Sequence, residues 1–341
     1  MTKPSRTDRK DAREKGPTGP RPAPRAARPA AVPPAPYGQG GGLSYGEYLH
    51  VPQILREQHC LADPPAHDEL QFIIVHQVYE LWFKLILHEL DAVKAALDEA
   101  GDAAAAGSAD SDDDPGERGA GDAAATIGDA GEREHRALRT ATRLSRRVEA
   151  ILKVLVQQIH VLESMRPVDF LAFRKNLNPA SGFQSAQFRQ VECLLGLKDE
   201  ALMRRLAADG QRAAVEERLQ GDTIPDALYR LLAAHGLRVT PPDEGRSDAQ
   251  REQTLEALRT IYESPDEHAP LHDVCEALLD VDEQVVLWRR HHVMMVERQI
   301  GAKPGTGKGT TGELDGIRYL QTTLAKHALP DLWAVRTVLQ G

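Results

Sequence analysis

The sequence predicts an all-α protein built as a helical bundle, and three observations carry that prediction. From Leu43 onward, apolar residues recur mostly three and four positions apart, which is the spacing of one helix face. Stretches that alternate apolar and polar residues, as strands do, are scarce. Prolines and glycines gather between the periodic stretches, at Pro167, 179–182, Pro225 and 241–242, where they mark helix boundaries.

Two segments lack the side chains needed for a core. Residues 1–42 are rich in Pro, Ala, Arg and Gly, and residues 99–131 consist largely of Ala, Gly and Asp, with an acidic run at 112–114. Neither segment can bury enough apolar surface to offset the entropy lost on ordering. We therefore expect a disordered basic tail over 1–42 and one folded domain over 43–341, interrupted by a flexible, disordered acidic insertion at 99–131.

The expected helices follow from the apolar periodicity between these boundaries. They cover residues 44–58, 68–98, 133–164, 168–176, 184–195, 198–207, 224–235, 248–263, 270–300, 312–326 and 330–339. The first helix carries Tyr45 and Tyr48 on a short amphipathic segment, which indicates an interface. The two long helices 68–98 and 270–300 hold the residues with the most informative chemistry.

Helix 68–98 is apolar on almost every side, and a helix without a broad polar face is normally buried in the middle of a domain. At about 100° per residue, Phe72, Tyr79 and Phe83 share one narrow stripe with His76. His76 is therefore expected to point into an aromatic wall.

Helix 270–300 has a charge-free sector about 100° wide. His292 lies near the centre of this sector, whereas His291 lies at its edge. We therefore expect His292 to be the inward histidine. The other members of the sector are Val281, Val285, Trp288, Met295 and Val296.

The composition argues against several classes of function. The chain has 42 basic and 51 acidic residues, a formal net charge of −9, and this balance argues against nucleic acid as a partner. Cys60, Cys193 and Cys275 stand far apart, which argues against a disulfide framework and a thiolate zinc site. No apolar stretch approaches the roughly 20 residues that span a bilayer. We expect a soluble, cytoplasmic protein with no membrane partner.

Two inward histidines on two long helices indicate a cofactor site between them. Taken singly, His76 and His292 would each more often be ordinary core residues. Helical bundles commonly build cofactor sites from facing side chains, and a haem needs one imidazole ligand within an apolar pocket. The competing hypothesis is a non-haem metal site, for which the nearest cluster pairs His76 with Glu80. Because Glu80 lies on the polar flank of its helix, the haem interpretation is favoured.

Two further features are candidates for ligand binding. Arg174 lies beside two phenylalanines and just ahead of the turn 178–184, where its guanidinium suits bidentate capture of a carboxylate as well as an ordinary surface ion pair. The glycine-rich loop 305–312, with Thr306 and Lys308, lets the backbone approach a ligand closely. Its glycine spacing does not match a phosphate-binding loop, so we interpret it as a lid.

Several motifs resemble the tryptophan 2,3-dioxygenase family, in the order and at the intervals found there. The resemblance covers about 43–98 and 133–341. The motifs are residues 43–49, 72–77 with 80–82, 181–185, and Trp288-Arg289 with His292 through 305–307.

The resemblance implies a haem-dependent enzyme with one haem b, iron protoporphyrin IX, in each subunit of a homotetramer. Such an enzyme cleaves the indole C2–C3 bond of L-tryptophan with O2, giving N-formyl-L-kynurenine, the first step of the kynurenine pathway. The resemblance implies that His292 is the axial ligand of the haem iron and that His76 is the catalytic histidine that meets the indole N–H. The implied substrate-binding residues are Phe72, Arg174, Ser181, Gly182 and Thr306, with Tyr45, Tyr48 and Leu49 closing the pocket of a neighbouring subunit.

The lid loop departs from the family pattern. Lys308 is inserted, Thr310 and Thr311 stand where the family usually has serines, and extra residues follow near 313–315. These changes leave undecided whether the lid closes as it does in the family. Two alternatives therefore remain: a related haem enzyme that oxidises another indole, and a non-catalytic haem protein that senses a ligand.

Overall fold

The computed structural model describes residues 43–109, 120–200, 210–243, 245–301, 303 and 320–340. These residues form α-helices, short 3-10 helices and loops, and none of them forms a strand, so the predicted all-α fold class is confirmed. The chain divides into an N-terminal unit that ends at Ile54 and a second unit that begins at Leu55. Each unit is described by itself.

The N-terminal unit contains two short helices in place of the single helix expected over 44–58. They are α1 (Tyr45–Tyr48) and α2 (Val51–Ile54). The Ser44 side chain caps α1 by accepting a hydrogen bond from the backbone at the third helical position. The prediction of one helix was wrong because His50 adopts a φ of 52°, in the left-handed region that a continuous helix does not allow.

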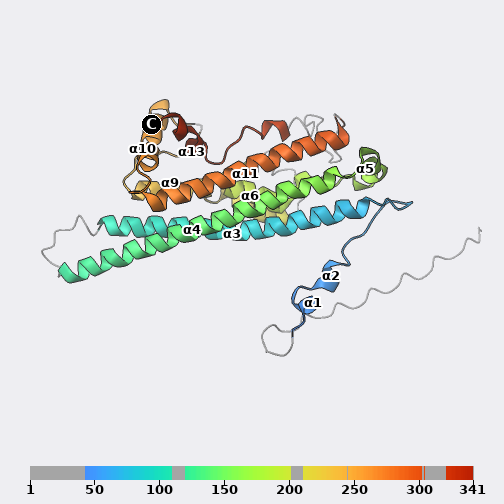
Figure 1. Ribbon diagram of the computed structural model, residues 1–341, viewed down its shortest axis with the longest axis horizontal. Coiled ribbons are helices and arrows are strands. Elements are labelled where there is room, and N and C mark those ends of the chain that lie inside the picture. The colour runs from blue at the N-terminus through green and yellow to red at the C-terminus, as the bar shows by residue number, and fades with distance from the viewer. Residues whose placement is uncertain are drawn as a thin grey trace, which may run out of the picture. The chain divides into compact units, whose positions relative to one another are not determined.

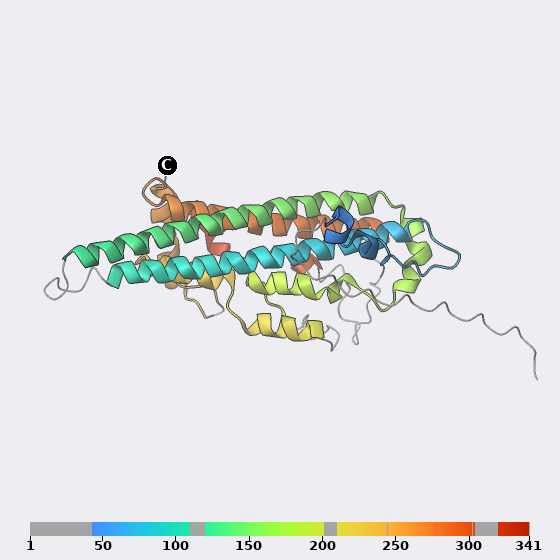
Figure 2. The same ribbon diagram turned by 90° about the horizontal axis from the view of Figure 1, so that it is seen from below.

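Three long helices form the frame of the second unit. They are α3 (Glu69–Ala109), α4 (Ala120–Glu163) and α11 (Ala269–Ile300), and α4 packs against both of the others (Figures 1 and 2). At a rise of about 1.5 Å per residue, each is long enough to extend through a whole domain. Side chains from all three build the main hydrophobic core, together with those of α9 (Ile224–Ala234).

Helices α3 and α4 continue beyond their expected ends. Residues 99–109 and 120–131 are helical, so the predicted flexible insertion at 99–131 needs correcting over these two stretches. Their alanines explain the difference, because alanine has the highest intrinsic helix propensity and Ala100, Ala103 and Ala130 are buried. The acidic run at 112–114 and the basic tail lie outside the described residues.

The remaining helices are shorter. Helix α8 was missed by the sequence analysis because Val215 is its only buried apolar residue. Residues 201–207 and 312–319, from two further expected helices, fall outside the described residues. The observed elements are α5 (Pro167–Arg174), η1 (Lys175–Leu177), η2 (Gly182–Gln184), α6 (Ala186–Leu194), α8 (Gly210–Gln220), α10 (Asp248–Glu263), α13 (Pro330–Ala334) and η3 (Val335–Thr337).

Helix ends follow local capping chemistry. Thr223 and Ser247 cap α9 and α10, each accepting a hydrogen bond from the backbone three residues on. Pro225 occupies the first turn of α9, where a missing backbone N–H costs nothing. Gly301 ends α11 with a φ of 57°, which is strained for any residue with a Cβ. These signals explain why the predicted ends of these helices are accurate to within one residue.

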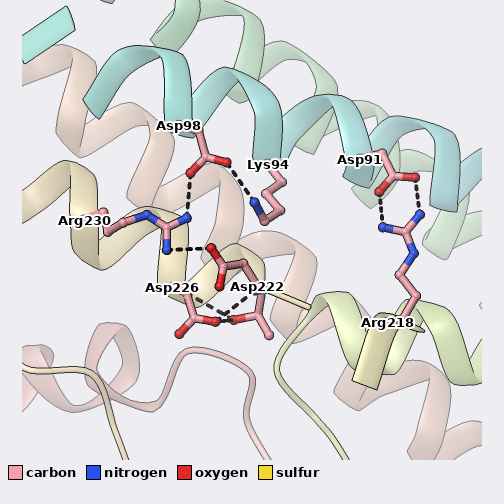
Figure 3. A network of polar contacts seen from close by, with 8 residues as sticks. Asp91, Lys94, Asp98, Arg218, Asp222, Asp226 and Arg230 are labelled. Carbon is pink, nitrogen blue, oxygen red and sulfur yellow. Dashed lines mark hydrogen bonds and ion pairs between the residues drawn. The ribbon is translucent and has the colours of Figure 1, made fainter. Parts of the chain in front are cut away.

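Ion pairs tie α8 and α9 to α3 (Figure 3). The guanidinium of Arg218 donates to both oxygens of Asp91 at 2.5 and 2.6 Å. Arg230 donates to Asp98 at 2.7 Å and pairs with Asp222 at 3.0 Å. All of these groups are partly exposed, so each pair contributes at most about 1 kcal/mol. They align the helices, while burial of apolar side chains provides most of the stability.

Helix α3 is long and apolar enough to cross a bilayer by length and composition. The expectation that no apolar stretch approaches such a length is therefore wrong for this helix. The same properties occur in core helices, and α3 packs against α4, α6 and α9. Its uncovered face carries Leu70, Ile74 and Leu81, which are 45, 43 and 56% exposed.

Candidate active site

A cavity of about 1070 Å³ lies among α3, α5, α6 and α11 in the second unit. Most of its wall is apolar, as expected for a site that encloses a large planar ligand. The stripe of α3 predicted to face a pocket supplies Phe72, His76, Tyr79 and Phe83. The other apolar residues of the wall include Met165, Phe170, Phe183, Phe188, Trp288, Met295 and Val296.

Of the two neighbouring histidines on α11, His292 lines this cavity and His291 does not. The His291 ring instead lies edge-on to His160, with ring centroids 6.0 Å apart. Burial lowers the pKa of His292 to about 4, with smaller contributions from His76 and Arg189. The His292 imidazole is therefore neutral at physiological pH, which is the form that binds a metal through a ring nitrogen.

His76 also faces the cavity, from α3. Its Nδ1 lies 2.7 Å from the backbone oxygen of Phe72, one turn earlier. A carbonyl oxygen can only accept, so Nδ1 carries the proton in this hydrogen bond and Nε2 is left as an acceptor. Burial lowers the pKa of His76, which keeps the ring neutral in this tautomer. The Phe72 ring packs on the imidazole at a centroid distance of 4.0 Å.

The structure brings together four of the eight predicted substrate-binding residues, one of which is Phe72. Arg174, at the end of α5, lines the cavity with Ser181 and Gly182. The Ser181 hydroxyl accepts a hydrogen bond from the Phe183 amide at 3.4 Å and so caps η2. Thr306 lies outside the described residues, as does the rest of the predicted lid.

The three residues predicted to reach a neighbouring subunit lie in the N-terminal unit. Tyr45, Tyr48 and Leu49 are 77, 62 and 38% exposed there. Large apolar side chains exposed on a short helix are typical of a surface that contacts a partner.

A buried charged cluster in the cavity wall was missed by the sequence analysis. The Glu192 carboxylate pairs with Arg189 at 2.6 Å through one oxygen and with Arg289 at 2.8 Å through the other. All three residues line the cavity and are less than 9% exposed. The only sequence signal was a pair of opposite charges three residues apart on a short helix, which is equally typical of an exposed surface.

Glu80 is more enclosed than we expected for a residue on the polar flank of its helix. It lines the cavity and accepts a hydrogen bond at 2.8 Å from the Gln187 side chain on α6. Within the described parts of the chain, no group of three or more His, Cys, Asp or Glu side chains is arranged to hold a metal ion. These residues therefore do not assemble the non-haem metal site that the sequence left open.

Comparison with known proteins identifies the family. The family model described as tryptophan 2,3-dioxygenase matches residues 34–105, 122–220 and 247–339. The chain belongs to the tryptophan 2,3-dioxygenase family. The resemblance noted from the sequence motifs is thereby confirmed. The family match skips residues 106–121, which include the acidic run at 112–114.

Individual members of the tryptophan 2,3-dioxygenase family match over nearly their full length. The tryptophan 2,3-dioxygenase of a Nocardioides species is 41% identical over 303 residues, which cover 88% of this chain and 96% of that protein. That of an Anaeromyxobacter species is 39% identical, covering 89% of this chain and 99% of the relative. That of Herpetosiphon aurantiacus is 37% identical, covering 87 and 98%. The similarity therefore extends across α3, α6 and α11, the helices that carry the cavity.

Proposed function

We propose that the chain is a haem-dependent tryptophan 2,3-dioxygenase that cleaves the indole C2–C3 bond of L-tryptophan with O2 to give N-formyl-L-kynurenine. Membership of the family supports the reaction. The single observation that carries the assignment of this site is that His76 and His292, on two helices far apart in sequence, face one apolar cavity.

The residues of the cavity fit a haem. A planar macrocycle needs apolar walls and one neutral imidazole, and the cavity supplies aromatic side chains and His292 with its low pKa. It also carries four cationic side chains against two carboxylates, which suits a cofactor that brings its own carboxylates. The cations are Arg174, Arg189, Arg289 and Lys303, and the carboxylates are Glu80 and Glu192. When bound, haem iron supplies the site at which O2 reacts.

His292 would hold the haem through its ring nitrogen. The Trp288 ring, one turn earlier on α11, lies parallel to the His292 imidazole and limits its rotation. One imidazole is enough as a protein ligand, so the rest of the cavity would be available to the substrate.

His76 would position the indole in this cavity. With its Nδ1 proton donated to the Phe72 carbonyl, its Nε2 accepts the indole N–H hydrogen bond without any change of tautomer. The indole N–H is a very weak acid, so we assign His76 a positioning role in preference to proton abstraction. Phe72 would pack against the indole ring, and the aromatic wall excludes water from the reacting bond.

Arg174 would bind the substrate carboxylate. A guanidinium gives two parallel charge-assisted hydrogen bonds to a carboxylate, which fixes both the position and the direction of an amino acid. Ser181 and Gly182, which line the same cavity as Arg174, would contact the same end of the substrate. Thr306 would contact the substrate ammonium and carboxylate from the lid.

We also propose a cytoplasmic homotetramer in which Tyr45, Tyr48 and Leu49 close the pocket of a neighbouring subunit. Self-association is supported by the uncovered stripe of Leu70, Ile74 and Leu81 on α3, because contiguous apolar surface of this kind usually marks an interface. The acidic net charge gives no support for nucleic acid as an alternative partner.

Product analysis tests this function. The full-length protein, loaded with haem and reduced, is incubated with L-tryptophan and air, and the products are identified by mass spectrometry. N-formyl-L-kynurenine is the expected product. Oxidation of another indole but not of tryptophan would indicate a related enzyme, and ligand-dependent spectral changes without any product would indicate a sensor.

A further inference from the structure

The cluster of Arg189, Glu192 and Arg289 has more positive charge than its own partners neutralise. Both Glu192 oxygens are used, one by each guanidinium. Arg289 has further acceptors, since its Nη1 lies 3.5 Å from the backbone oxygens of both Thr323 and Lys326. Arg189, by contrast, has a buried Nε with no hydrogen-bond partner.

A buried group of this kind is costly. A charged donor without a partner loses its hydration and forms no hydrogen bond to replace it. The attraction within a buried ion pair also compensates only poorly for the lost hydration of the two charges. Two buried guanidinium groups around one carboxylate leave one net positive charge in the cavity wall. A network that served packing alone would need no second cation, so the arrangement favours an anion as the missing partner.

The position of Arg189 indicates where that anion comes from. The Arg189 guanidinium packs over the Phe188 ring at 4.8 Å from the ring centroid, and both residues line the cavity. The Phe188 ring packs in turn on Trp288 at a centroid distance of 4.7 Å, and Trp288 stacks on the His292 imidazole at 5.3 Å. Arg189 therefore lies on the side of the cavity where the haem would be held, whereas Arg174 lies at the end of α5.

We propose that Arg189 binds a carboxylate of the haem, with Glu192 and Arg289 holding its guanidinium in the cavity wall. This inference rests on the proposed function, because it needs a haem in the cavity. Arg189 would be a cofactor-binding residue, and Glu192 a positioning residue that acts through it. The Arg189 Nε, which has no hydrogen-bond partner, would donate to the haem carboxylate. Glu192 neutralises only one of the two guanidinium groups, so the remaining positive charge would attract that carboxylate.

The test compares haem with its dimethyl ester, the same iron porphyrin with both carboxylates esterified. Haem-free, full-length protein is titrated with each compound, and binding is followed by the haem absorption spectrum. For the wild type, we expect haem to bind at least about tenfold more tightly than the ester. In Arg189→Gln, haem affinity should fall roughly 10- to 100-fold, while ester affinity stays unchanged.

Arg230→Gln is the matched control. It removes ion pairs to Asp98 and Asp222 that lie outside the cavity, so both affinities should match those of the wild type. The comparison of haem with ester in the wild type needs no variant and remains decisive if Arg189→Gln fails to fold.

Three results would overturn the proposal. Equal affinity of the wild type for haem and ester would show that no carboxylate is recognised. Equal loss of both ligands in Arg189→Gln would show that Arg189 serves only structure. Unchanged haem affinity with a raised KM for L-tryptophan would assign Arg189 to the substrate carboxylate. A wild-type protein that binds neither porphyrin would instead contradict the proposed function itself.

Discussion

The ring of Trp288 lies parallel to the imidazole of His292, with ring centroids 5.3 Å apart and 7° between the planes. The two residues are one turn apart on α11, where side chains four positions apart meet on one face. Trp288 packs in turn on Phe188 of α6 at 4.7 Å. The imidazole orientation is therefore fixed from two helices, as a ligand that must present one ring nitrogen requires.

The two histidines of α11 should differ sharply in haem binding. His292→Ala is expected to abolish stable haem binding, because the cavity loses its only neutral imidazole on that helix. His291→Ala should leave haem binding nearly intact, since the His291 ring faces His160 outside the cavity. Haem absorption spectra of both purified variants measure the difference. Equal losses in the two variants, or a loss with His291→Ala alone, would refute the assignment.

Arg174→Ala should impair turnover of L-tryptophan far more than haem incorporation. Loss of a charge-assisted bidentate contact costs about 2–5 kcal/mol, much of it from the unpaired substrate carboxylate. Steady-state kinetics with L-tryptophan, together with the haem content of the variant, provide the measurement. Tryptamine, which lacks the carboxylate, is the control substrate, and its turnover should differ little between wild type and variant. Normal turnover of L-tryptophan would mean that Arg174 contacts no substrate.

His76→Ala should keep measurable activity. A residue that positions the indole contributes less than one that must remove a proton, and the very weak acidity of the indole N–H argues for positioning. Turnover is measured on a variant shown to bind both haem and tryptophan. Complete inactivity of such a variant would assign His76 the role of catalytic base.

Enzymatic activity should depend on the N-terminal segment only from about residue 43 onward. Deletion of residues 1–42 is expected to leave activity unchanged, whereas deletion of residues 1–50 removes Tyr45, Tyr48 and Leu49 and should abolish most activity with haem still bound. The shorter deletion is the control for the longer one. A monomer in light scattering, or normal turnover after the longer deletion, would show that this segment closes no pocket.

A buried ion pair between Arg246, just before α10, and Asp331 of α13 should dominate local stability. Asp331 is 2% exposed, and Arg246 donates to its two oxygens at 2.6 and 2.9 Å while the Tyr229 hydroxyl donates to the same carboxylate. Asp331→Ala leaves Arg246 buried and unpaired, so the free energy of unfolding should fall by about 3–5 kcal/mol. Urea denaturation measures this change. Asp222→Ala, at an exposed pair, should cost at most about 1 kcal/mol, and equal losses would contradict the argument.

The parts of the fold that were predictable depend on local chemistry. Helix 248–263 was predicted with its observed bounds because Ser247 and the apolar spacing define it without outside help. The break at His50 and the helical stretches at 99–109 and 120–131 were not predicted. The break depends on the backbone conformation of His50 alone. The two helical stretches depend on the packing of alanines, in segments whose composition predicts flexibility.

The same distinction applies to the candidate site. Phe72, His76 and His292 could be placed from helix pitch, because a regular helix fixes which side chains share a face. The Arg189 and Arg289 cluster could not, because it depends on a contact between α6 and α11, which are about 100 residues apart. Helical periodicity carries no information about which distant charge will meet which. The domain boundary at residue 43 stays a prediction.

Isotope labelling distinguishes a dioxygenase from an enzyme that oxidises L-tryptophan in another way. The reduced, haem-loaded protein is incubated with L-tryptophan under heavy-isotope O2, and the product is analysed by mass spectrometry. The expected product is N-formyl-L-kynurenine that carries two heavy oxygen atoms, both taken from one O2 molecule. A product with one heavy atom or none, or the absence of any ring-opened product from protein that binds haem and tryptophan, would contradict the assignment of this chain as a tryptophan 2,3-dioxygenase.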